Sequence, residues 1–213
     1  MRRHSLGALA ALFLAPAGAW TPTDAPLTLQ PESRLWVDGT STVRAFKCKA
    51  VVLEADIAAA PGAVSAVLAG EKAVKSVEVR VPAARMDCGN GTMNEHMLKA
   101  LKAKEHGLIT FRVASYDVDK TGDGVRGTLT GTLTLGGVAK TISVAATGQA
   151  TGQATGQGAA GGQLRVTGVH ELKMTDYGLK PPSLMMGTMK VGDVVKVGFD
   201  LVLKGEPRVA TTQ

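Results

Sequence analysis

The sequence predicts an all-β protein, an eight-stranded antiparallel barrel with one helix. Several segments alternate apolar and polar residues with a period of two, which is the pattern of half-buried strands. Short glycine-containing turns join neighbouring segments and favour antiparallel pairing. The 213 residues suffice for one such domain with a buried core, and no change in composition indicates a second domain. A sandwich of two sheets is the structural alternative.

Residues 1–19 have the organisation of a secretory signal peptide. Arg2 and Arg3 form a basic start, Leu6–Leu14 is apolar, and the small residues Ala17–Ala19 follow. The apolar run is too short to span a bilayer as a helix. We therefore expect cleavage after Ala19 and a periplasmic or secreted mature protein.

The rest of the chain divides into three parts. Residues 20–33 show neither helical nor strand periodicity and are expected to lie on the surface. Residues 34–204 are predicted to form the barrel domain, and residues 205–213 a C-terminal tail.

The first predicted strands come from the N-terminal half of the barrel domain. Arg34–Val37 begins the ordered part, and Val43–Val52 is expected to be a strand. Period-two spacing places apolar side chains on one face of each later segment. These faces hold Phe46, Cys48, Ala50 and Val52, with Arg44 beside them near the barrel mouth, and then Val77, Val79 and Val81.

One helix is predicted between the strands. Thr92 is the expected N-cap, Glu95 completes a capping box, and Gly107 is placed to end the helix. Its apolar stripe would consist of Met97, Leu98 and Leu101, whereas its lysines fall on other faces. The helix is therefore expected to act as a lid or plug at a barrel end.

The strongest strand pattern lies in the C-terminal half. Val125, Gly127, Leu129, Gly131, Leu133 and Leu135 alternate with Arg126 and threonines, and Gly136-Gly137 then supplies a hairpin turn. The other strands are predicted around Ile109–Val113, Val138–Val144, Leu164–Leu172 and Val194–Leu203. Gly127 and Gly131 either leave room on the inner face or mark bends of the barrel.

An Ala-Thr-Gly-Gln repeat occupies Ala146–Gln157 and is interpreted as an extended hairpin tip or a flexible loop.

The sequence contains two cysteines, Cys48 and Cys88. Because export leads to an oxidising compartment, we expect them to form a disulfide. Two buried free thiols are the alternative, and a redox pair is disfavoured because the cysteines lack Cys-x-x-Cys spacing.

Charge argues against a nucleic-acid partner. The formal net charge is +6, and removal of Arg2 and Arg3 leaves +4, with the remaining basic residues interspersed among acids. A mildly basic surface suits transient contact with anionic lipid headgroups, although solvated lysines are the simpler interpretation. The oligomeric state is not encoded in these features.

The sequence predicts no catalytic residues, no metal site and no cofactor. His96 and His106 would stand about 15 Å apart along a helix, too far to share one ion. His170 and Glu171 are adjacent on a strand and point to opposite faces. Each histidine is therefore interpreted as satisfied or exposed. Nucleophile-elbow, phosphate-loop and zinc-binding motifs are also missing from the sequence, so we expect a protein that is not an enzyme.

Three stretches in the same order resemble the YceI-like family of bacterial envelope proteins. They are Met93 to Met97 continuing through His106-Gly107-Leu108-Ile109-Thr110-Phe111, the hairpin Gly131 to Lys140, and Leu172 to Pro182 followed by Lys190-Val191-Gly192-Asp193-Val194. The chain departs from the family in two places. Thr40-Ser41 stands where the family is associated with a His-Ser pair, and the Ala-Thr-Gly-Gln repeat is the other departure.

This resemblance implies a lipocalin-like barrel that holds the isoprenoid tail of a polyisoprenoid or quinone-like lipid. Apolar strand faces and flexible methionines would suit such a lining. The predicted ligand-binding residues are Phe46, Val79, Phe111, Leu129, Leu133, Met185, Met189 and Phe199. The alternative is a structural or stress-related envelope protein whose barrel is filled by side chains, with the methionines as ordinary core.

Overall fold

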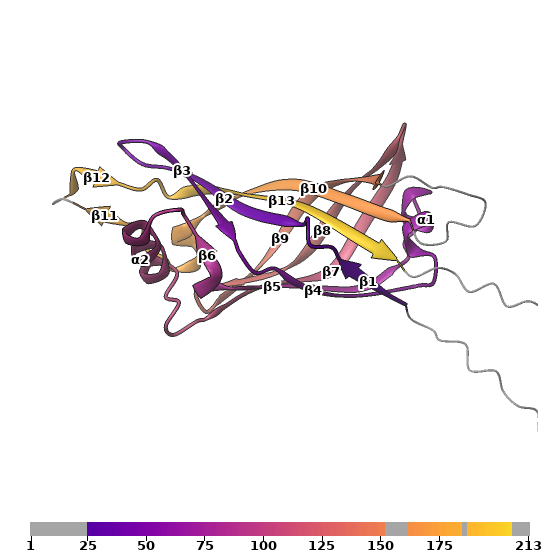
Figure 1. The fold of residues 1–213 in the computed structure, drawn as a ribbon, viewed down its shortest axis with the longest axis horizontal. Helices are drawn as coiled ribbons and strands as arrows, with labels where there is room; N and C mark the ends of the chain where they lie inside the picture. Colours follow the sequence, from indigo (N-terminus) through magenta and orange to yellow (C-terminus); the bar gives the residue numbers. More distant parts are fainter. Residues whose placement is uncertain (1–24, 152–161, 185–186, 206–213) are drawn as a thin grey trace, which may run out of the picture.

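The structure is a computed structural model that describes residues 25–151, 162–184 and 187–205 (Figure 1). The predicted signal peptide, most of the repeat, Met185 and nearly all of the C-terminal tail lie outside these residues, so the structure does not test the predictions made for them.

Eight antiparallel strands close into a barrel, as predicted. In spatial order they are β1 (Ala25–Leu29), β4 (Glu54–Ala59), β5 (Val74–Pro82), β7 (Leu108–Thr121), β8 (Gly124–Leu135), β9 (Val138–Thr151), β10 (Gln163–Lys173) and β13 (Val194–Gly205). Pairing of β1 with β13 completes the ring. The barrel confirms the fold class and rules out the two-sheet sandwich.

The barrel strand that pairs with β13 on the side away from β10 is interrupted. β1 pairs with Leu203–Gly205 of β13, whereas β2 (Arg34–Thr40) pairs with Lys196–Asp200 farther along the same strand. Ser33 bridges the interruption, because its Oγ accepts a hydrogen bond from the Val202 N–H at 3.0 Å. β1 and β2 thus act as one broken barrel strand.

Two further strands are broken in the same way. β3 (Ala45–Ala50) pairs with β2, and β6 (Met86–Asp87) pairs with β3, after the 3-10 helix η1 (Ala83–Arg85). β3 is shorter than the predicted strand Val43–Val52, because the chain turns at Val51 and resumes as β4. In the described part of the chain β6 is the edge of the sheet, so backbone pairing does not close the barrel at this end.

A short helix closes the opposite end of the barrel. α1 (Ala63–Leu68) was not predicted, and it buries Val64 and Val67 against a core that includes Leu27, Ile57, Val125, Leu164 and Leu203. Figure 1 shows α1 at one end of the barrel and α2 (Gly91–Ala100) at the other. The α1 end is therefore filled with apolar side chains.

The main helix, α2, confirms the prediction of one helix at a barrel end, but its bounds differ from those predicted. Its N-cap is Asn90, whose side chain accepts a hydrogen bond from the Met93 N–H at 3.1 Å, and Thr92 lies inside the helix. Asparagine caps at least as well as threonine. The helix ends at Ala100, before the predicted Gly107, and Lys102 adopts a left-handed conformation with φ of 53°.

The segment predicted as irregular surface, residues 20–33, contains a strand. β1 lies within it, and Leu27 is only 4% exposed, because pairing with β4 and β13 carries this side chain into the core beneath α1. The first part of the Ala-Thr-Gly-Gln repeat also belongs to a strand, since β9 continues to Thr151 and buries Ala146.

The glycines of β8 mark close backbone contacts. A Cβ atom at Gly127 would overlap the Asp117 carbonyl oxygen of β7, and one at Gly131 would overlap the Arg112 carbonyl oxygen. The register between β7 and β8 shifts between Val113 and Ser115, which marks a bulge. These glycines therefore mark a bend of the barrel where β7 and β8 approach closely. They leave no room for a ligand, because the backbone of β7 occupies the space beside them.

β9 and β10 separate toward the α2 end of the barrel. Their pairing stops at Gly168 and Ala146, and the 3-10 helix η2 (Met174–Tyr177) contacts both strands beyond that point. Tyr177 is 2% exposed and packs with Leu172 and Leu179. A small hairpin of β11 (Ser183–Leu184) and β12 (Met189–Lys190) extends the same end.

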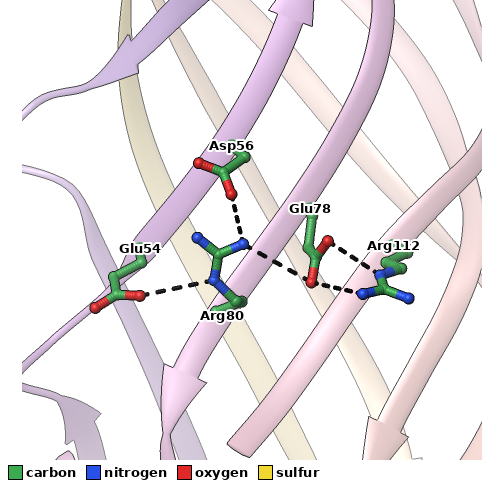
Figure 2. A network of polar contacts seen from close by, with 5 residues as sticks. All are labelled: Glu54, Asp56, Glu78, Arg80 and Arg112. Carbon is green, nitrogen blue, oxygen red and sulfur yellow. Dashed lines mark hydrogen bonds and ion pairs between the residues drawn. The ribbon is translucent and has the colours of Figure 1, made fainter.

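Charged side chains pair across the outer face of β4, β5 and β7 (Figure 2). Arg80 lies between Glu54, Asp56 and Glu78, and the Arg112 Nε lies 3.0 Å from Glu78 Oε2. The hydrogen bond that Arg80 donates to the Asp56 carboxylate is the main cause that raises the pKa of Arg80. The predicted alternation is thus confirmed on β5, with charged residues outside and Val77, Val79 and Val81 inside.

Candidate functional site

An apolar cavity of about 630 Å³ lies inside the barrel. Its size falls in the range of cavities that hold small organic ligands, roughly 300 to 1,000 Å³. Inward residues of eight strands form most of its surface, namely β2, β3, β5, β7, β8, β9, β10 and β13. Residues of α2 line one end. Besides the predicted residues, the apolar wall includes Leu35, Val37, Val77, Val81, Ile109, Val113, Leu135, Ile142, Val144, Val166, Leu172, Val195, Val197 and Leu201.

Seven of the eight side chains that the sequence singled out lie along this cavity. They are Phe46, Val79, Phe111, Leu129, Leu133, Met189 and Phe199. Met185 lies outside the described residues. Whether these side chains bind a ligand stays a prediction.

Two aromatic rings of the lining lie over a glycine of the neighbouring strand. A Cβ atom at Gly39 would overlap the Phe46 ring, and one at Gly168 would overlap the Phe199 ring. Each pair is directly opposite in the strand register. The glycines therefore let large apolar rings cover the wall without filling the space at the barrel axis.

The predicted disulfide between Cys48 and Cys88 is present and lines the cavity. It joins β3 to the segment that leads into α2. The Asn94 Oδ1 accepts a hydrogen bond from the Cys88 N–H at 2.7 Å, and Cys88 Sγ lies 3.4 Å from Met97 Sδ. The disulfide and these contacts fix the start of α2 over the open end of the sheet.

The mouth of the cavity lies at the α2 end. The turn between β2 and β3 contributes Ser41, Val43 and Arg44, and the start of α2 contributes Asn90 and further polar residues. Val43 lines the cavity and is 66% exposed, so the cavity reaches the surface here.

Hydrogen bonds tie the turn between β2 and β3 to the hairpin near the mouth. The Thr42 N–H donates to the Lys190 carbonyl at 3.0 Å, and Ser41 forms a bridge with Val191. Two loops far apart in the sequence therefore form one side of the opening. No period-two pattern in the sequence could have predicted this contact.

His170 is a polar residue of the lining that was not among the predicted ligand-binding residues. Its imidazole is neither exposed on the outer surface nor hydrogen-bonded to any described residue, and it lines the cavity from β10. Burial lowers its pKa. His170 is an even number of positions away from three inward residues of β10, Leu164, Val166 and Leu172, so it lies on the same face of the strand. This spacing is the sequence signal that could have indicated its position.

Within the described ranges, no three histidine, cysteine, aspartate or glutamate side chains gather closely enough to hold a metal ion. In the same part of the chain, no helix has the length and apolar character needed to cross a membrane.

Solved structures share this architecture. BcnA of Burkholderia cenocepacia has a TM-score of 0.62 at 18% identity, with 82% of this chain and 99% of that chain covered. A polyisoprenoid binding domain from Saccharophagus degradans, implicated in plant cell wall breakdown, has a TM-score of 0.58 at 16% identity over 86% of this chain and 99% of its own. The Campylobacter jejuni YceI protein has a TM-score of 0.55 at 21% identity over 76% and 85% of the two chains.

No curated protein matches the sequence closely enough to count as a relative. The model of the YceI-like domain, however, matches residues 36–203, which is most of the chain and nearly all of the barrel. The order of the motifs, the closed barrel and this match agree. The chain belongs to the family of YceI-like domains.

Proposed function

We propose that this protein binds one long apolar lipid, of the polyisoprenoid or quinone-like class, inside its barrel and does not act as an enzyme. The cavity carries this proposal, because its wall is mostly apolar and it opens at one end. A structural barrel would fill its interior with side chains, as this chain does at the α1 end. The similarity to a polyisoprenoid binding domain supports the same class of ligand.

The energetics of burial suit such a ligand. Each methylene group moved from water into the cavity contributes roughly 0.8 kcal/mol, so a few isoprene units contribute enough for tight binding before the cost of ordering is subtracted. No catalytic group is needed for this function. The binding and release of lipid then depend on access through the mouth.

We further propose that the protein is exported before it binds lipid. The disulfide suits an oxidising compartment, and the basic and apolar start of the sequence suits secretion. N-terminal sequencing of protein recovered from the cell envelope tests this proposal. Trp20 is the expected first residue, and an intact Met1 would contradict export.

A substitution at Leu129 tests whether the lumen is a binding site. In an open lumen, Leu129→Trp fills space that the lipid needs, so binding of a fluorescent polyprenyl probe should fall at least about tenfold with the fold retained. In a filled barrel, the same change would overpack the core and cost about 1 to 3 kcal/mol of stability. The measurements are probe titration and urea unfolding.

Thr128→Trp is the matched control, because Thr128 is the exposed neighbour of Leu129 and points to the outer face. This variant should bind the probe as the wild type does. Absence of probe binding by the wild type, together with a loss of stability in Leu129→Trp, would favour the structural barrel over the lipid carrier.

A further inference from the structure

His170 is a polar side chain on an otherwise apolar part of the barrel wall. β10 alternates, so Glu171 points outward, where its carboxylate lies 3.0 Å from Lys196 Nζ, while His170 faces the cavity. Its partner in the strand register is Val197 of β13, and Phe199 covers Gly168, the preceding inward position of β10. The inward side chains that neighbour His170 on β13, Val197 and Phe199, are apolar.

The other polar lining residues lie elsewhere. Ser41, Arg44, Asn90, Thr92 and His96 come from the turn and helix at the mouth. None of the described residues hydrogen-bonds the His170 ring. His170 therefore belongs to a wall strand, whereas the other polar lining residues belong to the turn and the helix at the mouth.

The chemical state of the ring follows from its surroundings. Desolvation lowers the pKa of His170, so the imidazole is neutral at pH 7 and offers one hydrogen-bond donor and one acceptor. A lipid that fills the cavity expels the water that can otherwise satisfy these groups. An unsatisfied imidazole would then oppose binding, unless the lipid itself supplies a partner.

We propose that His170 hydrogen-bonds an uncharged oxygen of the bound lipid and makes the barrel select oxygen-bearing prenyl lipids over hydrocarbons of equal length. This inference rests on the proposed function and adds the chemistry of the ligand to it. A quinone carbonyl and an alcohol hydroxyl both meet the requirement. A phosphate does not, because Arg44 at the mouth is the one cationic side chain in the described lining.

Four probes with the same 20-carbon prenyl chain test the proposal. They are a prenylated benzoquinone, the alcohol geranylgeraniol, geranylgeranyl phosphate and the hydrocarbon without any oxygen. Affinities are measured with the full mature chain by competition against a fluorescent prenyl probe. We expect the quinone or the alcohol to bind about fivefold more tightly than the hydrocarbon, which is the effect of one net hydrogen bond.

Substitutions at His170 locate the source of this preference. His170→Phe should remove the preference, and the hydrocarbon should bind at least as tightly as to the wild type because no unsatisfied imidazole opposes it. His170→Gln should restore part of the preference because its amide can donate and accept. His96→Phe is the matched control at the mouth and should keep the preference. Thermal unfolding confirms that each variant is folded, and His170→Leu replaces His170→Phe if the larger ring prevents folding.

The outcomes separate this inference from the proposed function. Equal binding of all four probes, tightest binding of the phosphate, or a preference that survives His170→Phe would overturn the role of His170 while leaving lipid binding in place. Loss of the preference in His96→Phe instead would assign the lipid oxygen to the mouth and also overturn it. Failure of the wild type to bind any probe would refute both proposals.

Discussion

At the scale of single residues, the space inside this barrel depends on the positions of glycines in its wall. Phe46 and Phe199 are among the largest side chains of the lining, yet each lies against the wall over a glycine of the neighbouring strand. Such an arrangement covers glycine backbone with an aromatic ring and protects its hydrogen bonds. It also keeps the ring away from the barrel axis, so the glycine controls the volume available to a ligand.

Replacement of Gly39 should therefore narrow the cavity. In Gly39→Ala the new methyl group occupies the place of the Phe46 ring, which must turn toward the lumen. We expect severalfold weaker binding of a long prenyl probe and a small change in stability, because the displaced group is a flexible side chain. Probe titration and thermal unfolding check this.

Gly91→Ala is the control for this experiment, because a Cβ atom there meets no atom within 4 Å. Unchanged affinity for the long probe in Gly39→Ala would show that the position of the Phe46 ring does not limit the cavity.

A second residue-scale prediction concerns pH. Arg165 donates from Nε to Asp200 Oδ1 at 2.6 Å and also contacts Oδ2, and this hydrogen bonding, with the charges of Arg165 and Arg34, lowers the pKa of Asp200. Because the pKa of Asp200 is lower in the folded state than in the unfolded state, its ionised carboxylate stabilises the fold at pH values above about 4, the pKa of Asp in the unfolded chain. This stabilisation is lost as the pH falls through the pKa of Asp200 in the folded state. Asp200→Asn should cost about 1 kcal/mol at pH 6 and much less at pH 3.

Urea unfolding at the two pH values measures the effect. Glu171→Gln serves as the comparison, since both partners of the Lys196–Glu171 pair are exposed and their attraction is screened by solvent. An equal loss of stability in Asp200→Asn at both pH values would contradict the assignment to Asp200.

At the scale of elements, the mouth of the barrel is held by connections that are distant in sequence. β6 leaves the sheet open on one side, and α2 lies over that opening. The disulfide ties the start of α2 to β3, while the turn between β2 and β3 is hydrogen-bonded to β12. The cover over the cavity therefore depends on cross-links more than on the burial of α2, none of whose residues is fully buried.

Removal of the disulfide should weaken the fold and loosen α2. The two cysteines are 40 residues apart, and the chain-entropy model assigns a loop of this length about 4 kcal/mol. We expect Cys48→Ala/Cys88→Ala to lose stability of that order in urea, with faster hydrogen exchange in α2.

Wild-type protein treated with a reductant should unfold at the same urea concentration as the double variant. Equal stability of the oxidised wild type and the double variant would show that the cross-link does not stabilise the fold.

The elements that the sequence predicts well are those with a sustained pattern. β8 alternates over its whole length, and the Gly136-Gly137 turn is confirmed by positive φ angles at both glycines. β1 and α1 have only five and six residues, so neither shows enough periods to be recognised. For the same reason, period-two spacing placed the wall residues of the site, whereas the mouth residues lie in turns and required the structure.

His170 shows the other limit of the sequence. Because His170 and Glu171 are adjacent in a strand, the sequence shows that they point to opposite faces. Which of the two faces lies inside depends on how the barrel closes. A histidine in a strand is usually assigned to the polar face. Here the run from Leu164 through Val166 and Gly168 to Leu172 determines the inner face, and it carries His170 into the cavity.

At the scale of the whole molecule, the two ends of the barrel differ. The α1 end is packed with apolar side chains, and the α2 end has a rim with Arg44 and the exposed Val43. A ligand must therefore enter and leave at the α2 end. The paired charges on the outer face of β4, β5 and β7 keep that wall polar toward solvent, whereas the side chains that line the cavity are mostly apolar.

We propose that this interior holds a lipid in the cell. The most direct test is mass spectrometry of an organic extract from the full-length protein, purified from its native compartment without detergent, beside an extract of Leu129→Trp. We expect a prenyl lipid bearing an uncharged oxygen, near one molecule per chain in the wild type and depleted in the variant. Wild-type protein that yields no lipid, from a barrel that Leu129→Trp destabilises by overpacking, would contradict this proposal.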